Sequence, residues 1–68
     1  MSQQLVARIE KTSKYAYQAP KHGGGWFDVI RVKADSLGYD VHGNNNDYRR
    51  GDLAFGVLDD GKIMELKS

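Results

Sequence analysis

Hydrophobic and polar residues alternate along most of this chain, and such alternation favours β-strands over helices. Nowhere do apolar residues recur every three or four positions for long enough to form one face of an amphipathic helix. We therefore expect strands at residues 5–10, 14–18, 26–33, 37–42, 53–58 and 63–67. We expect loops or turns at residues 19–25, 34–36 and 43–47, and one turn of 3₁₀ helix at residues 48–51.

The segment 26–33 has apolar residues at both odd and even positions, which is typical of a strand in the middle of a sheet. The expected faces are Trp26, Asp28, Ile30 and Val32 on one side and Phe27, Val29, Arg31 and Lys33 on the other. We expect one of Trp26 and Phe27 to lie in the core. In residues 14–18, Tyr15 and Tyr17 are expected to share a face.

The C-terminal segment predicts a β-hairpin. Asp60-Gly61 stands between two apolar runs and suits a two-residue type I′ turn, whose central residues both have positive φ. This turn pairs Asp59 with Lys62, Leu58 with Ile63, Val57 with Met64 and Phe55 with Leu66. One face then consists wholly of apolar residues and is expected to be core: Leu53, Phe55, Val57, Met64 and Leu66. The other face is mixed, and its Leu58 and Ile63 are expected to meet solvent or a partner.

Five or six short strands without room for a helix predict an all-β fold: one domain over residues 1–68, built as a small antiparallel barrel that is SH3-like in general shape. The segment Lys14-Tyr15-Ala16-Tyr17 resembles the aromatic motif of peptide-binding SH3 domains. The acidic loop that those domains use against arginine-flanked proline peptides is missing from this sequence. A likeness at the level of the fold implies no function by itself.

Composition excludes several classes of protein. The chain of 68 residues has no cysteine, so it can form neither disulfides nor a thiolate zinc site. No apolar run is long enough to span a membrane, and the N-terminus lacks the apolar stretch of a signal peptide. We expect a small cytoplasmic protein of the form common among bacterial or phage accessory proteins, with no membrane association.

Catalysis and metal binding are not expected. No serine or threonine stands at a spacing that marks a nucleophile with its base, and His22 and His42 are not at a defensible metal-ligand spacing from Asp40 or Asp47. A barrel of this length is also expected to offer little concave volume. We therefore expect a protein that is not an enzyme and that uses no cofactor and no metal.

The function expected from these residues is non-catalytic binding of a protein partner, in a regulatory role. Tyr and Arg are enriched in binding hot spots, and they cluster at Tyr48-Arg49-Arg50 beside a polar loop. Consecutive glycines at residues 23–25 can present backbone N–H groups to an anion beside Lys21 and His22. The candidate binding residues are Trp26, Tyr48, Arg49, Arg50, Lys21 and His22.

Two alternatives stay open. The net charge of +1 conceals an asymmetry, because residues 1–33 hold six basic and two acidic residues while residues 34–68 hold four basic and seven acidic ones. Aromatic and basic residues are interleaved in segment 11–33, which also suits nucleic-acid binding by stacking and phosphate contacts. Self-association through an open sheet edge is a further expectation, because short strands with glycine breaks often leave a barrel incompletely closed.

Overall fold

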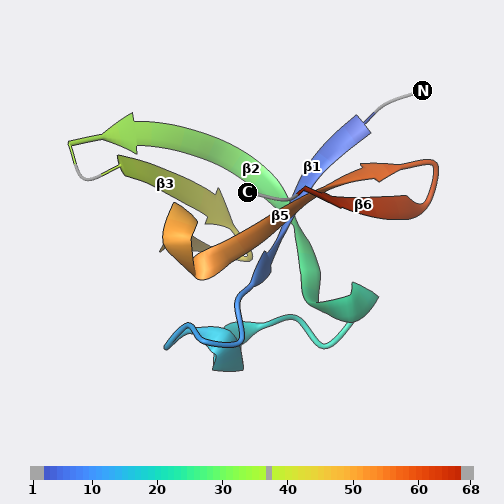
Figure 1. Ribbon diagram of the computed structural model, residues 1–68, viewed down its shortest axis with the longest axis horizontal. Coiled ribbons are helices and arrows are strands. Elements are labelled where there is room, and N and C mark those ends of the chain that lie inside the picture. The colour runs from blue at the N-terminus through green and yellow to red at the C-terminus, as the bar shows by residue number, and fades with distance from the viewer. Residues whose placement is uncertain (1–2, 37, 67–68) are drawn as a thin grey trace.

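The computed structural model describes residues 3–36 and 38–66 and contains a single six-stranded antiparallel sheet (Figure 1). The strands are β1 (Gln3–Ile9), β2 (Trp26–Asp35), β3 (Gly38–Gly43), β4 (Asn46–Arg49), β5 (Leu53–Asp59) and β6 (Lys62–Leu66). Three short 3₁₀ turns connect them: η1 (Ala16–Gln18), η2 (Gly23–Gly25) and η3 (Arg50–Asp52). The all-β prediction is confirmed.

The strand order is β4-β3-β2-β1-β5-β6, and within residues 3–36 and 38–66 the two outermost strands pair with one neighbour each. The sheet is therefore not closed into a barrel, so the predicted barrel is wrong in this respect, whereas the open sheet edge agrees with the expectation. The physical reason lies in β1, which pairs with β5 over its whole length but with β2 only from Val6 to Arg8. Beyond Asp28, β2 leaves β1 and continues as a hairpin with β3, which diverges from the β5–β6 hairpin in Figure 1.

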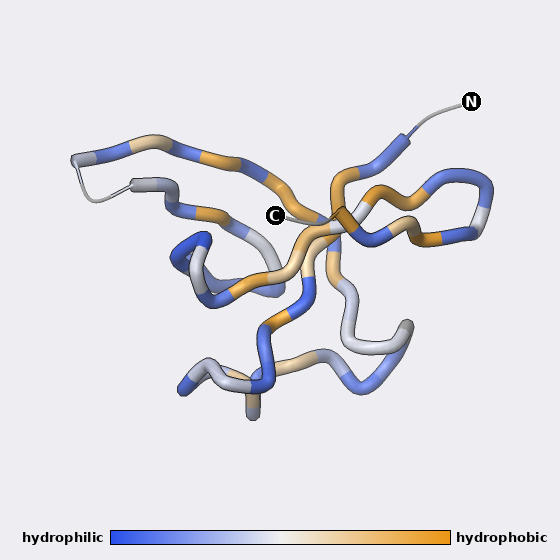
Figure 2. Tube along the Cα trace, viewed as in Figure 1, coloured by the Kyte–Doolittle hydropathy of each residue, from blue (hydrophilic) through white to orange (hydrophobic). Residues whose placement is uncertain are grey.

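The core is built from side chains of β1, β2, β3, β4 and β5, and Figure 2 shows hydrophobic stretches along the strands while the connecting loops are largely hydrophilic. Its buried members are Ala7, Ile9, Phe27, Val29, Val41, Tyr48 and Leu53. Phe27 is thus the core aromatic of the pair Trp26 and Phe27, as expected, and β2 is central because it pairs with both β1 and β3. The side of the sheet that carries these core residues is called the concave face below.

The predicted C-terminal hairpin is confirmed in its register, with all four expected pairs formed. Asp60 and Gly61 have φ values of 53° and 77°, as a type I′ turn requires. The prediction that its apolar face is core holds only in part, because Met64 is 74% exposed and Leu66 is 49% exposed. These residues lie on β6, at the end of the open sheet, where no further strand of residues 3–36 and 38–66 covers them.

A β-bulge changes the faces predicted for β2. The register with β3 shifts between Val29 and Arg31, so Ile30 is an extra residue in the ladder. After this shift Val32 stands opposite the buried Val41 and shares its face, whereas Ile30 is 71% exposed. The expected grouping of Trp26, Asp28, Ile30 and Val32 is therefore wrong beyond the bulge.

The segment 14–18 is not a strand, and this prediction is wrong. The Ser13 hydroxyl accepts a hydrogen bond from the Tyr15 backbone N–H (3.0 Å), and the Ser13 carbonyl accepts one from Ala16 (3.1 Å). These local bonds turn the chain into η1 instead of extending it. Tyr15 consequently packs against the core, whereas Tyr17 is 81% exposed.

The connection predicted as a loop at residues 43–47 is instead a tight hairpin turn between β3 and β4. Asn44 and Asn45 have φ values of 53° and 61°, so two asparagines make a turn of the same kind as Asp60-Gly61. The predicted 3₁₀ turn at residues 48–51 occurs at Arg50–Asp52, because β4 continues to Arg49. In the predicted turn at residues 34–36, Ala34 and Asp35 belong to β2, and Leu37 lies outside the described residues.

Candidate functional site

An apolar groove of about 360 Å³ lies on the concave face, between the diverging β2–β3 and β5–β6 hairpins. Six of its seven lining residues are apolar: Leu5, Val32, Tyr39, Val41, Phe55 and Leu66, with Arg50 as the seventh. We call this feature the concave groove. It contradicts the expectation of little concave volume, because an open sheet leaves hollow the space that a closed barrel would fill.

The walls of the concave groove are incompletely covered. Val32, Tyr39 and Leu66 come from three different strands and are 46%, 50% and 49% exposed. The bulge at Ile30 is what turns Val32 into the groove. Apolar side chains gathered in a hollow in this way are typical of binding surfaces, whereas single exposed apolar residues are ordinary.

The concave groove opens into a wider and more polar hollow of about 940 Å³. Tyr39, Arg50, Phe55 and Leu66 line both spaces. The additional residues of the wider hollow include four charged or polar side chains: Glu10, Thr12, Arg49 and Glu65.

Two of the charges around the wider hollow are already neutralised. The Arg49 guanidinium donates from Nη1 to both carboxylate oxygens of Asp35, at 3.1 and 2.9 Å, and these hydrogen bonds raise the pKa of Arg49 above its usual value. Arg8 Nη2 donates to Glu65 Oε1 at 2.9 Å. The Arg50 side chain, in contrast, has no hydrogen bond or ion pair in the described part of the chain. Of the predicted residues Arg49 and Arg50, only the second therefore has a guanidinium that is free to meet a ligand.

Trp26 lies on the other face of the sheet from the core. A Cβ placed on Gly56 would lie 3.1 Å from the tip of the Trp26 ring, so the glycine allows the indole to rest on β5. The Arg8 guanidinium carbon lies 5.2 Å from the ring centroid, a cation–π distance. Trp26 is thus half-buried between β5 and an arginine, and it does not line the concave groove.

Tyr48, a predicted contact residue, is 2% exposed and belongs to the core. Its hydroxyl donates to Gln18 Oε1 at 2.7 Å and accepts from Asn44 Nδ2 at 3.2 Å, and its ring packs against Tyr15 and Phe27. The side chain therefore ties the long β1–β2 connection to the sheet. Its burial removes it from any exposed contact surface, which corrects the sequence-based expectation.

Lys21 and His22 are exposed and precede η2, in which Gly24 and Gly25 have positive φ values of 70° and 88°. Neither residue lines the concave groove or the wider hollow. The structure thus separates the six predicted binding residues, and it brings only Arg49 and Arg50 to the same hollow.

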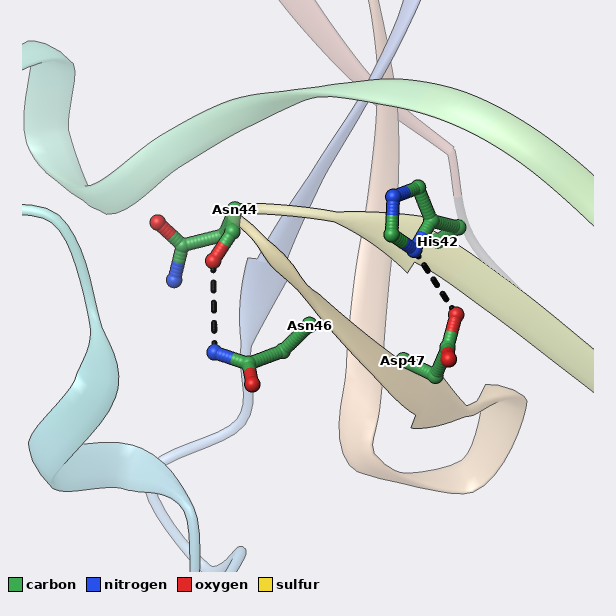
Figure 3. Close-up of polar contacts among 4 residues, drawn as sticks. All are labelled: His42, Asn44, Asn46 and Asp47. Carbon is green, nitrogen blue, oxygen red and sulfur yellow. Dashed lines mark hydrogen bonds and ion pairs between the residues drawn. The ribbon is translucent and has the colours of Figure 1, made fainter.

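A histidine–carboxylate pair crosses the β3–β4 hairpin. His42 and Asp47 are directly opposite in the ladder, and His42 Nδ1 lies 2.8 Å from Asp47 Oδ1 (Figure 3). At the nearby turn, Asn46 Nδ2 donates to the Asn44 carbonyl at 3.3 Å, also drawn in Figure 3. Within residues 3–36 and 38–66, no group of three or more His, Cys, Asp or Glu residues is placed to hold a metal ion. Sequence reasoning missed this pair because it treated residues 43–47 as a loop, and an Asn44-Asn45 hairpin turn would have revealed it.

Sequence reasoning also missed the concave groove. It assigned Phe55 and Leu66 to the core, and it read Val32 and Tyr39 only as strand residues. The signal that could have found the groove is the apolar face of the C-terminal hairpin, which holds five apolar side chains near the end of the chain. None of the other predicted strands is available to cover this apolar face of the hairpin.

Comparison of the chain with models of protein families, with curated proteins and with solved structures found no match. Among the described residues, no helix has the length and apolar character needed to cross a membrane.

Proposed function

We propose that this protein is a non-catalytic, cytoplasmic interaction module that binds a protein partner in the concave groove, in a regulatory role. The observation that carries the proposal is the set of half-exposed apolar side chains that line this hollow: Val32, Tyr39 and Leu66. Covering them removes apolar surface from water, which favours association by roughly 25 cal/mol for each Å² buried. We also propose that the fold is SH3-like in general shape. The pairing of β5 with β1 and the position of η3 between β4 and β5 support this.

Two neighbouring residues of β2 allow a matched test of this proposal. Val32 lines the groove, whereas Ile30, at the bulge, is more exposed but does not line it. We expect immobilised full-length protein to retain a partner from a cell lysate, and we expect Val32→Ser to lose that partner. The Ile30→Ser variant should retain the partner, because it also removes an exposed β-branched side chain, but one that lies outside the groove. Equal capture by both variants would refute binding in the groove.

Nucleic-acid binding by segment 11–33 is the second candidate. The observation in its favour is Tyr17, which is 81% exposed among exposed basic residues of the same segment, including Lys11, Lys14 and Lys21. Such a surface binds single strands through stacking and phosphate contacts, and its affinity falls steeply with salt. A fluorescent single-stranded oligonucleotide titrated at low and at high salt measures this directly. Steep, salt-sensitive binding that Tyr17→Ala weakens would favour this candidate over the first.

A further inference from the structure

We propose that the concave groove accepts an extended segment of a partner protein in which a carboxylate lies next to a bulky apolar side chain. This inference rests on the proposed function, because it names the chemistry of the partner for the same groove. The apolar side chain fills the space between Val32, Phe55 and Leu66, and the carboxylate pairs with Arg50.

The carboxylate is inferred from the charges around the groove. Arg50 is the only charged residue among the seven that line it, and its side chain has no ion pair or hydrogen bond in the described part of the chain. A guanidinium has five N–H donors in a fixed fork that matches the two oxygens of a carboxylate. The neighbouring Arg49 already donates from Nη1 to both carboxylate oxygens of Asp35, which leaves Arg50 as the guanidinium that can donate to an external acid.

The position of the acid within the partner is restricted by the wider hollow. Glu10 and Glu65 line that hollow, and neither lines the apolar groove. A carboxylate placed in the wider hollow outside the apolar groove would share that space with Glu10, whose side chain has no cationic partner among the described residues. An acidic residue is therefore favoured directly beside the apolar anchor and disfavoured further along.

The experiment uses a phage-displayed library of random dodecapeptides, selected on the immobilised full-length protein and depleted on the Val32→Ser variant. We expect enrichment of peptides with Asp or Glu beside Leu, Ile, Phe or Trp. One enriched peptide is then labelled with a fluorophore and titrated by fluorescence polarisation. We expect Arg50→Gln to weaken its binding at least about tenfold, as for loss of a charge-assisted hydrogen bond.

Arg31→Gln is the matched control, because it removes one positive charge from β2 without touching the groove, and it should change the affinity less than about twofold. A companion peptide with Asn or Gln in place of the acid should bind the wild type about as weakly as the acidic peptide binds Arg50→Gln. Circular dichroism of each variant shows whether it is folded, and Arg50 is exposed, so its replacement is not expected to disturb the core.

The outcomes distinguish the inferred carboxylate from the groove itself as the binding site. Apolar peptides without an acid, or acidic peptides whose affinity is unchanged in Arg50→Gln, would overturn the inferred carboxylate and leave the groove as a binding site. If the depletion on Val32→Ser removes every peptide that the wild type retains, or if no peptide is enriched at all, both would be overturned. Self-association at the concentrations used, measured by sedimentation velocity and abolished by Val32→Ser, would assign the groove to a second copy of the chain and would overturn the inferred partner.

Discussion

Gly43 is in close contact with the strand beside it. A Cβ added at this position would lie 2.6 Å from the Asp28 carbonyl oxygen and 2.8 Å from a carbon of the Phe27 ring. Because one neighbour is backbone and the other is a core aromatic, neither can move without disturbing β2. We expect Gly43→Ala to lower the free energy of unfolding by about 2 kcal/mol, measured by urea denaturation.

Gly51 offers the control for this prediction. It lies in η3, and a Cβ there would meet nothing within 4 Å. Gly51→Ala should therefore change the free energy of unfolding by no more than roughly 0.5 kcal/mol in either direction. Equal stability of the Gly43→Ala protein and the wild type would show that β2 and β3 do not pack as closely as described.

At the level of single residues, the sequence could predict that Phe27 is core, but it could not predict the role of Tyr48. Both depend on packing, yet Phe27 belongs to an apolar strand, whereas Tyr48 stands between Asp47 and Arg49. Its burial comes from the β3–β4 hairpin, which turns the ring onto Phe27, and from Gln18, which satisfies the hydroxyl. No local pattern shows that a glutamine thirty residues away will do this.

The β3–β4 and β5–β6 hairpins are the elements that local chemistry controls most directly. Asp60-Gly61 contains a glycine, whereas Asn44-Asn45 places two side-chain-bearing residues at positive φ. Asparagine tolerates this conformation better than most residues, and an alanine there costs roughly 1–2 kcal/mol. The Asn45 side chain makes no hydrogen bond in the described structure, so a substitution there tests the backbone alone.

We therefore expect Asn45→Ala to lower the free energy of unfolding by about 1 kcal/mol, because alanine resists the φ of 61°. Asn45→Gly should be at least as stable as the alanine variant and close to the wild type, because glycine adopts positive φ without strain. Thermal denaturation of the three proteins, followed by circular dichroism, gives the ranking. If alanine and glycine were equivalent, residues 44 and 45 would not form this turn.

The elements that sequence could predict are those whose geometry is decided within a few residues. The register of the C-terminal hairpin followed from one two-residue turn, and it is confirmed pair by pair. The bulge at Ile30 has no such local cause, since it accompanies the departure of β2 from β1 after Asp28. A single extra residue reverses every face that follows it, which is how Val32 came to line the groove.

On the scale of the whole molecule, the open sheet exposes more of its concave face than a closed barrel would. The prediction of a barrel followed from five or six short strands without room for a helix, and the alternation of residues does not determine whether such a sheet closes. The structure instead leaves Met64 and Leu66 on β6, Val32 on β2 and Tyr39 on β3 partly in water. The candidate site therefore consists of apolar side chains that the open sheet leaves partly exposed. The pattern of residue types along the chain does not show which side chains these are.

The open sheet also predicts an uneven distribution of stability. β1 lies between β2 and β5 and contains Val6, Ala7 and Ile9, which are 2%, 0% and 3% exposed, whereas every residue of β6 is exposed. Local opening requires least free energy where few apolar contacts are lost. In hydrogen–deuterium exchange, we expect the amides of β1 to be the most protected and the paired amides of β6 to exchange through local opening.

The concentration dependence of this exchange decides whether the free edge of β6 meets a second copy. If the edge stays open, protection of β6 is the same at low and at tenfold higher protein concentration. If two copies pair edge to edge through β6, its protection rises with concentration while that of β1 does not, because only the edge gains new hydrogen bonds. Protection of β6 equal to that of β1 at every concentration would contradict the open sheet itself, since a strand with one neighbour and no buried residue has too few contacts to resist opening.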